Sequence, residues 1–264
     1  MLETDAKLTA EHFFEELAQS PAGALLLDYD GTLAPFQVER DRAFPYPGVS
    51  ALLQEIMNTG HTQVVVITGR RAQDVIPLLG LVPHPEIWGV YGLQRLKSDG
   101  TCEMPRLEEN VVQALAAAAE WVNELEFGNV LELKPGSVAV HWRGLEESLA
   151  TRIRGNVLLG WLPIADRARM TLQEFDGGVE MKLATSDKGD AVRKFVAELD
   201  SAISVAYLGD DQADEDAFRV LQNRGLRVLV RPEWRETGAD VWLRPPEELV
   251  KFLFQWLTIC RGEK

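Results

Sequence analysis

Two carboxylates, one residue apart, end an apolar segment near the start of the chain. Asp28 follows the run Leu25–Leu27 directly, Asp30 comes two positions later, and Gly31 and Thr32 complete the segment. In open parallel sheets, ligands bind beyond the carboxyl ends of the strands, so both acids are expected in such a crevice. Gly31 would let the chain turn and bring backbone N–H groups close to an anion.

Two other interpretations of this segment have to be considered. A calcium-binding loop would place Asp28, Asp30 and Glu39 at its first, third and twelfth positions. Such a loop needs glycine at position six, where this chain has Leu33, and it follows a helix rather than a strand. A helix cap or an acidic turn also fits the segment alone, and only the other segments argue against it.

A hydroxyl, a glycine and a guanidinium follow a second buried run. Thr68, Gly69 and Arg70 come directly after Val64–Ile67. A hydroxyl and adjacent N–H groups at a strand end are suited to holding phosphoryl oxygens. A threonine between a strand and a helix is also an ordinary helix cap, so both interpretations stay open.

A lysine begins a later helical pattern. Lys188 stands immediately before the predicted helix Gly189–Leu199. A cation is unfavourable there because the N-terminus of a helix is the positive end of its dipole, and a nearby anion would explain the placement. The alternative is a lysine exposed on the surface.

Acidic residues crowd the segment after the predicted strand Ile203–Leu208. Asp210, Asp211 and Asp214 lie in this segment and are followed by two further acids. Some can cap a helix, because acids favour its first turn. Like charges packed together repel by a few kcal/mol at an effective dielectric constant of about 20. Clusters of oxygen ligands suit Mg²⁺, so the cluster predicts a magnesium site.

The elements that would position these groups alternate along the chain. Short apolar runs predict strands, and amphipathic segments between them predict helices, which together indicate a parallel α/β sheet. The predicted strands are Ala24–Leu27, Gln63–Ile67, Ile203–Leu208 and Arg227–Val230. The predicted helices are Val49–Thr59, Arg71–Leu79, Gly189–Leu199, Glu215–Gln222 and Glu247–Leu257.

The middle of the chain has a different order of predicted helices and strands. It predicts, in order, a helix, a strand pair, a helix and another strand pair, which is an α+β module inserted at about 103–183. The elements are Glu108–Leu125, Val130–Leu133 with Ser137–Trp142, Leu145 to about Leu159, and Ala168–Phe175 with Val179–Leu183. The predicted domains are therefore a core of 1–102 and 184–264 and an insert of 103–183.

Composition limits the partners. The net charge of −14 argues against binding a nucleic-acid backbone, whereas a small phosphorylated substrate needs only a local positive site. The two cysteines do not form a disulfide framework. Residues 1–19 have neither a basic start nor an apolar run, and no apolar stretch approaches the roughly 20 residues of a membrane span. We expect a cytoplasmic protein with no membrane partner, and a monomer.

Taken together, the four segments resemble the four motifs of haloacid dehalogenase-like phosphotransferases, in the same order along the chain. Their counterparts are the Asp-x-Asp-Gly-Thr of residues 28–32, Thr68, Lys188 and the Gly-Asp-Asp of residues 209–211. The resemblance covers the whole chain. It implies a Rossmann-like core, and it implies that the insert is a C2-type cap.

The resemblance also implies a role for each site residue. Asp28 would attack phosphorus and form an aspartyl phosphate, and Asp30 would be the general acid and base. Mg²⁺ would be held by Asp28, the backbone carbonyl of Asp30 and Asp210, with Asp211 and Asp214 as further ligands or supporting groups. The phosphoryl group would contact Thr68 and Lys188, and the substrate would also contact Gly31, Thr32, Gly69 and Arg70.

The insert carries charged residues in alternation. Two pairs of an acid and a base, and a similar pair of a histidine and an arginine, have their members two residues apart, so each pair is expected to point to one face of a sheet. These residues are Glu132 and Lys134, His141 and Arg143, and Glu180 and Lys182. They could bond sugar hydroxyls, or they could form cross-strand ion pairs on a solvated face, which contribute little stability.

A narrower resemblance concerns the substrate. The segment 131–143, and the segments around Asp28 and Asp210, look like those of trehalose-6-phosphate phosphatases. This implies hydrolysis of trehalose 6-phosphate, a small sugar phosphate, with a synthase expected as a separate polypeptide. Two positions depart from that pattern, since Tyr91 and Gln94 stand where the family usually has histidine and glutamate.

These departures leave the reaction class unchanged and keep other substrates open. The alternatives are sucrose phosphate, glucosylglycerol phosphate and mannosyl-3-phosphoglycerate. A non-catalytic sugar-phosphate sensor is a further alternative, although a sensor has no need for the acid and base at Asp30.

Overall fold

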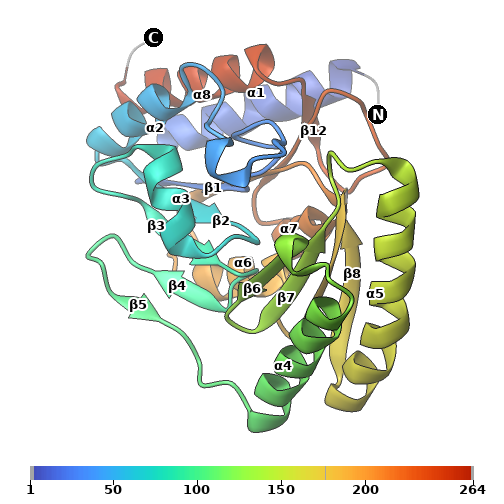
Figure 1. The fold of residues 1–264 in the computed structure, drawn as a ribbon. Helices are drawn as coiled ribbons and strands as arrows, with labels where there is room; N and C mark the ends of the chain where they lie inside the picture. Colours follow the sequence, from blue (N-terminus) through green and yellow to red (C-terminus); the bar gives the residue numbers. More distant parts are fainter. Residues whose placement is uncertain (1–2, 176, 263–264) are drawn as a thin grey trace. The chain divides into compact units, whose positions relative to one another are not determined.

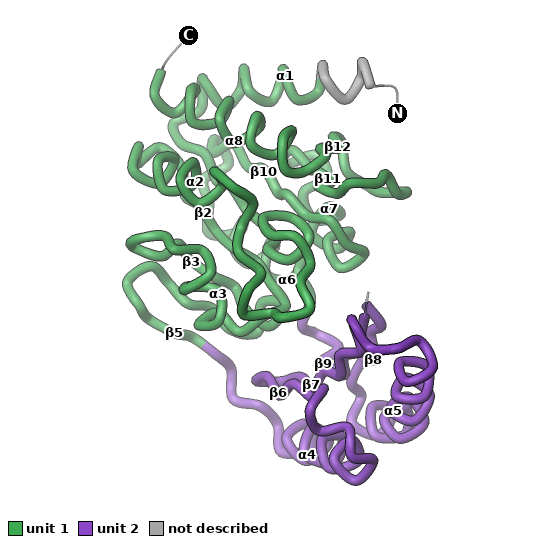
Figure 2. Tube along the Cα trace, turned by 45° about the horizontal axis from the view of Figure 1, so that its top comes forward, with its two compact units in different colours: residues 1–103, 187–264 green, residues 104–186 purple. Residues whose placement is uncertain are grey.

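The structure, a computed structural model, describes residues 3–175 and 177–262. The chain divides into two compact units, one formed by residues 1–103 and 187–264 and the other by residues 104–186 (Figure 2). The second unit is a continuous segment that interrupts the first. Within the described residues, no helix combines the length and the apolar character needed to cross a bilayer.

An eight-stranded sheet forms the centre of the first unit. Its strand order is β12-β11-β10-β1-β2-β3-β4-β5, in which all neighbours from β12 to β3 are parallel and β4 and β5 are antiparallel. The strands are β1 (Gly23–Leu27), β2 (Thr62–Ile67), β3 (Glu86–Gly89), β4 (Gln94–Leu96), β5 (Cys102–Glu103), β10 (Ser204–Gly209), β11 (Leu226–Val230) and β12 (Val241–Leu243).

Helices cover both faces of this sheet because its central strands are apolar on both sides (Figure 1). Alternate residues of β1 show this, since Leu25 and Leu27 enter one apolar cluster and Leu26 enters the other. The first cluster includes α1 (Glu3–Gln19), α2 (Val49–Asn58), α3 (Ala72–Leu79) and α8 (Glu247–Cys260). The second includes α6 (Lys188–Ala197) and α7 (Glu215–Leu221).

The second unit is an antiparallel sheet with two helices on one face. Its strand order is β6-β7-β9-β8, and the apolar face of the sheet packs on α4 and α5. The elements are α4 (Glu109–Glu124), β6 (Leu131–Lys134), β7 (Ser137–His141), α5 (Glu147–Ala168), β8 (Met170–Phe175) and β9 (Gly178–Leu183). Short 3-10 helices lie at Arg40–Arg42, Gly128–Val130 and Gln212–Asp214.

The predicted α/β class is confirmed, and the predicted elements lie within a few residues of those observed, with one exception. The helix expected to end near Leu159 continues to Ala168. Gly160 lies inside it because a Cβ there would come within 2.2 Å of the ring of Trp121, so glycine allows the two helices to approach closely. Five elements that are peripheral or short were not predicted from the sequence, namely α1, β3, β4, β5 and β12.

Candidate active site

The candidate active site lies where the direction of strand succession reverses. The chain passes from β1 to β2 on one side, and β10 lies on the other side of β1. Asp28 follows β1, and its N–H donates to the carbonyl of Leu208 in β10 at 2.9 Å. Asp210 follows β10 directly. The carboxyl ends of these strands therefore bring two predicted site residues, distant in sequence, to one point.

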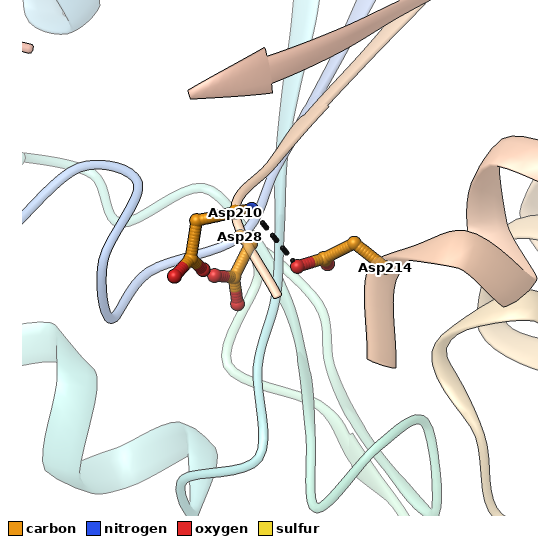
Figure 3. Close-up of side chains that lie close together, drawn as sticks. All are labelled: Asp28, Asp210 and Asp214. Carbon is orange, nitrogen blue, oxygen red and sulfur yellow. Dashed lines mark hydrogen bonds between the residues drawn. The ribbon is translucent and has the colours of Figure 1, made fainter. Parts of the chain in front are cut away.

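Three buried carboxylates meet at this point. Asp28, Asp210 and Asp214 each offer an oxygen, and the three oxygens lie within 4.8 Å of one another (Figure 3). The hydroxyl of Thr32 donates to Asp28 Oδ2 at 3.2 Å and lies 3.5 Å from Asp210 Oδ1. The calcium-loop interpretation does not explain this arrangement, because two of the three acids come from a different segment.

Gly31 makes room for one of these acids. Its φ of +89° is a backbone conformation that glycine adopts without strain. A Cβ at this position would lie 2.1 Å from Asp210 Oδ2. The glycine predicted to approach an anion thus lies directly against a carboxylate of the cluster.

Lys188 completes the cluster. Its ammonium donates to Asp28 Oδ1 at 2.6 Å and to Asp214 Oδ1 at 2.7 Å, and the side chain is buried. The surface-lysine interpretation is therefore wrong. Burial alone would lower the pKa of Lys188, but Asp214 and Asp28 together hold its pKa above the ordinary value.

The cluster holds more negative than positive charge. Burial raises the pKa of Asp28 to about 7, Lys188 opposes that rise, and Asp214 adds to it. Burial also raises the pKa of Asp210 well above its ordinary value, and Asp28 and Asp214 raise it further. One ammonium thus does not compensate three buried carboxylates.

Asp214 is bonded through both of its oxygens. Oδ1 accepts from Lys188 and from the hydroxyl of Tyr207 at 2.5 Å, and Oδ2 accepts from the backbone N–H groups of Asp210 at 3.0 Å and Asp211 at 2.9 Å. The carboxylate of Asp211 accepts from the N–H of Gln212 and caps the short helix there. Of the two acids expected as further ligands or supporting groups, Asp214 therefore lies in the cluster, and Asp211 serves as a cap.

Arg70 holds the second acid of the first motif. Its Nε and Nη2 each donate to Asp30 at 2.6 Å, and Nη1 donates to the carbonyl of Arg40 at 2.7 Å. The hydroxyl of Thr68 accepts from the N–H of Arg70 at 3.1 Å, while α3 begins at Ala72 with no side-chain cap. The helix-cap interpretation of Thr68 is therefore wrong.

The two residues that depart from the family pattern lie beside this motif. The ring of Tyr91 packs on Gly69, where a Cβ would come within 2.6 Å of Tyr91 Cζ. The side-chain oxygen of Gln94 accepts from the N–H of Ala72 at 3.0 Å, at the start of α3. Both residues thus support the segment from Thr68 to α3, which the sequence alone did not indicate.

In the second unit, five of the six alternating charged residues share one face of the sheet, whereas Arg143 lies beyond the end of β7 at His141. Lys134 contacts Glu180 at 2.5 Å and Glu132 at 3.9 Å, and His141 lies 2.9 Å from Glu132. The hydroxyl of Ser137, which the sequence did not single out, donates to Glu180 at 2.6 Å. Lys182 pairs with Ser137 in the ladder, and Arg143 lies next to Gly177. Cross-strand ion pairs are thus present, and a role in binding sugar stays a prediction.

Comparison with known proteins gives consistent results. A family model described as "Trehalose-phosphatase" matches residues 26–237. "Probable trehalose-phosphate phosphatase C" of Arabidopsis thaliana is 26% identical over 291 residues, which cover 97% of this chain and 85% of that protein.

Solved structures agree with the fold. The C-terminal domain of trehalose-6-phosphate phosphatase from C. albicans superposes with a TM-score of 0.75 at 18% identity and covers 97% of each chain. A haloacid dehalogenase-like hydrolase from Bacteroides thetaiotaomicron has a TM-score of 0.63 at 13% identity, covering 89% of this chain and 99% of the other. These two likenesses concern the fold.

Proposed function

Because the chain belongs to the trehalose-phosphatase family, and is thereby a phosphoric monoester hydrolase, we propose that it hydrolyses trehalose 6-phosphate to trehalose and phosphate. The observation that carries this proposal is the buried group of Asp28, Lys188 and Asp210 within the family match. It unites, at one strand end, a nucleophile, a cation and a further oxygen ligand.

The residues present fit a magnesium ion. Carboxylate oxygens are the ligands that Mg²⁺ prefers, and Asp28 and Asp210 lie side by side, with Gly31 leaving space against Asp210. Both acids have a raised pKa, and a divalent cation would offset the cause of that rise. We infer that Asp28, Asp210 and the carbonyl of Asp30 hold the ion. Asp214 supports this site by accepting hydrogen bonds from Lys188 and from the N–H groups of the loop that carries Asp210.

Asp28 is the group that attacks phosphorus. A carboxylate oxygen forms a bond to phosphorus in line with the leaving sugar oxygen, whose bond to phosphorus breaks, so an aspartyl phosphate forms. Bound magnesium supplies positive charge that stabilises the transferring phosphoryl group. Lys188 adds a second positive charge at Asp28 Oδ1 and reduces the repulsion between an anionic nucleophile and an anionic substrate.

Asp30 moves the protons of both steps. It gives a proton to the leaving sugar oxygen, and it then takes one from the water that attacks the aspartyl phosphate. Its two-point contact with Arg70 fixes the direction of the carboxyl group. Thr68, which directly follows the neighbouring strand β2, would donate its hydroxyl to a phosphoryl oxygen.

The substrate is selected by the second unit in this proposal. Its sheet presents Glu132, Lys134, Glu180 and Lys182 on the face opposite α4 and α5, and such groups can bond several sugar hydroxyls at once. The family model is described as "Trehalose-phosphatase", and the sequence relative reported above is named "Probable trehalose-phosphate phosphatase C", which supports trehalose 6-phosphate over the other candidate sugar phosphates.

A panel of phosphate esters tests this choice. With magnesium present, we expect kcat/KM to be highest for trehalose 6-phosphate, above sucrose phosphate, glucosylglycerol phosphate and mannosyl-3-phosphoglycerate. Released phosphate is the measurement. A preference of about 100-fold for another member of the panel would contradict the assignment, since differences of that size reflect the binding groups of a site.

A matched pair of variants tests whether the charged face of the sheet in the second unit binds the sugar. Glu180→Gln should raise KM for trehalose 6-phosphate, whereas Glu174→Gln should leave KM within about twofold. Glu174 is a suitable control because it lies on the neighbouring strand and pairs with Arg154 on α5. Equal KM values in both variants would argue that this sheet face does not bind the sugar.

The remaining features are inferred from the sequence alone. We propose a cytoplasmic monomer that acts on the product of a separate synthase. A non-catalytic sensor is disfavoured because Asp28, Asp30 and Lys188 are all present, and a sensor needs no group for proton transfer.

A further inference from the structure

We propose that Arg235, which lies outside the four motifs, is a positioning residue that fixes the backbone of the loop carrying Asp210. This inference rests on the proposed magnesium site and adds to it a residue from another segment. The guanidinium of Arg235 donates from Nε to the carbonyl of Asp210 at 3.1 Å and from Nη2 to the carbonyl of Asp211 at 2.7 Å.

The loop is held from two opposite sides. The N–H groups of Asp210 and Asp211 both donate to Asp214 Oδ2, while the carbonyls of the same two residues both accept from Arg235. In each of these two residues, the N–H group is thus held by the carboxylate of Asp214 and the carbonyl by the guanidinium of Arg235. A backbone bonded on both sides has little freedom to rotate, so the direction of the Asp210 side chain is fixed.

Arg235 is itself anchored. Its Nη1 forms an ion pair with Glu215 at the start of α7 and donates to the carbonyl of Glu236 at 2.9 Å. Glu215 also accepts from the hydroxyl of Thr237 at 2.7 Å and from the N–H of Gly238 at 2.8 Å. The side chains of Arg235 and Glu215 are only 17% and 15% exposed. The connection between β11 and β12 is therefore tied to the loop after β10.

Small displacements of this loop would change ligand geometry. Magnesium demands ligand oxygens in near-ideal octahedral geometry, and residues that orient its ligands affect its affinity by about 10- to 100-fold. The planar guanidinium makes several bonds in fixed directions, which an ammonium cannot reproduce. Loss of Arg235 should consequently weaken magnesium binding, although no atom of Arg235 contacts Asp28 or Lys188 among the described hydrogen bonds.

Calorimetric titration of the full chain with MgCl₂ tests the proposal without relying on turnover. For Arg235→Met we expect the Kd for Mg²⁺ to rise by about 10-fold, and for Arg235→Lys by a smaller factor. In assays, the magnesium concentration for half-maximal turnover should rise in parallel. KM for the sugar phosphate at saturating magnesium should stay within about twofold, since Arg235 acts through the metal ligands.

Arg224→Met is the matched control. Arg224 also donates to two backbone carbonyls, those of Ile203 and Asp200, but at the opposite end of β10. It should lower the melting temperature without changing the Kd for Mg²⁺. If it weakens magnesium binding as much as Arg235→Met does, the effect is general destabilisation and the proposal is wrong.

The other outcomes are distinguishable. Wild-type protein that binds no Mg²⁺ would overturn the proposed function. Wild-type binding with an unchanged Kd in Arg235→Met would overturn only the role of Arg235. Should Arg235→Met fail to fold, Arg235→Lys decides, because it keeps the charge beside Glu215, and an unchanged Kd in that variant contradicts the inference.

Discussion

Replacement of Asp28 by asparagine is expected to lower kcat by at least about 10⁴-fold, because the amide cannot attack phosphorus. Asparagine has nearly the same size as aspartate, and Lys188 keeps its partner Asp214 at 2.7 Å. The variant should therefore fold, with a melting temperature within a few degrees of wild type. Phosphate release from trehalose 6-phosphate measures the first effect, and thermal unfolding followed by circular dichroism measures the second.

Asp216→Asn provides the control for this experiment. Asp216 belongs to the same acidic segment but is 41% exposed and pairs with Arg219 on its own helix. Its replacement should leave kcat within about twofold, because an exposed ion pair of this kind contributes little. Near-normal turnover by Asp28→Asn, or an equal loss in both variants, would contradict the assignment of Asp28 as the nucleophile.

Removal of magnesium is expected to have the second large effect. Excess chelator should reduce turnover by at least about 100-fold, and added Mg²⁺ should restore it, since the ion offsets the repulsion among Asp28, Asp210 and the substrate phosphate. Initial rates across a magnesium titration give the measurement. Undiminished turnover in chelator would show that the carboxylates act without a metal.

Variants of Asp210 and Asp211 distinguish the proposed magnesium ligand from the neighbouring helix cap. Asp210→Asn should raise the magnesium concentration for half-maximal turnover by about 10-fold or more, because a carboxylate ligand is lost. Asp211→Asn should change it little, because asparagine can also accept from the N–H of Gln212 and cap the short helix. Equal shifts would mean that Asp211 also binds the ion.

The sequence predicted the fold well where the signal was local. Apolar runs such as Leu25–Leu27 can be recognised because strands buried on both faces are nearly continuous in hydrophobic residues. Asp28 and Asp210 could be placed together because each follows such a run, and parallel strands end at one edge of a sheet. The same reasoning placed Lys188 near an anion through its unfavourable position at a helix start.

Contacts that depend on side-chain direction could not be predicted. The ion pair of Arg70 with Asp30 was not predicted, because no pattern in the sequence marks two residues 40 positions apart as an ion pair. The expected contact of Arg70 with substrate stays a prediction. Tyr207 was predicted only as a residue of an apolar strand, although its hydroxyl donates to Asp214. Arg235 lies outside every motif, and only the structure shows it on the carbonyls of Asp210 and Asp211.

The helix α5 shows a further reason for such misses. Gly160 and Pro163 would usually indicate the end of a helix, because neither favours its interior. The helix continues because the ring of Trp121 from α4 packs closely against Gly160, and this is a contact between segments far apart in sequence. Local preference is here outweighed by packing, which a single sequence does not display.

The covalent step can be tested directly by trapping. Enzyme mixed with trehalose 6-phosphate, quenched in acid and treated with borohydride should contain homoserine in place of aspartate at position 28, because borohydride reduces an acyl phosphate. Peptide mass spectrometry would locate the change, and enzyme without substrate should show none. Homoserine at position 28 alone is the expected result. Reduction at Asp30 instead, or at neither residue while trehalose is released in a burst, would contradict the proposal that Asp28 carries the phosphoryl group.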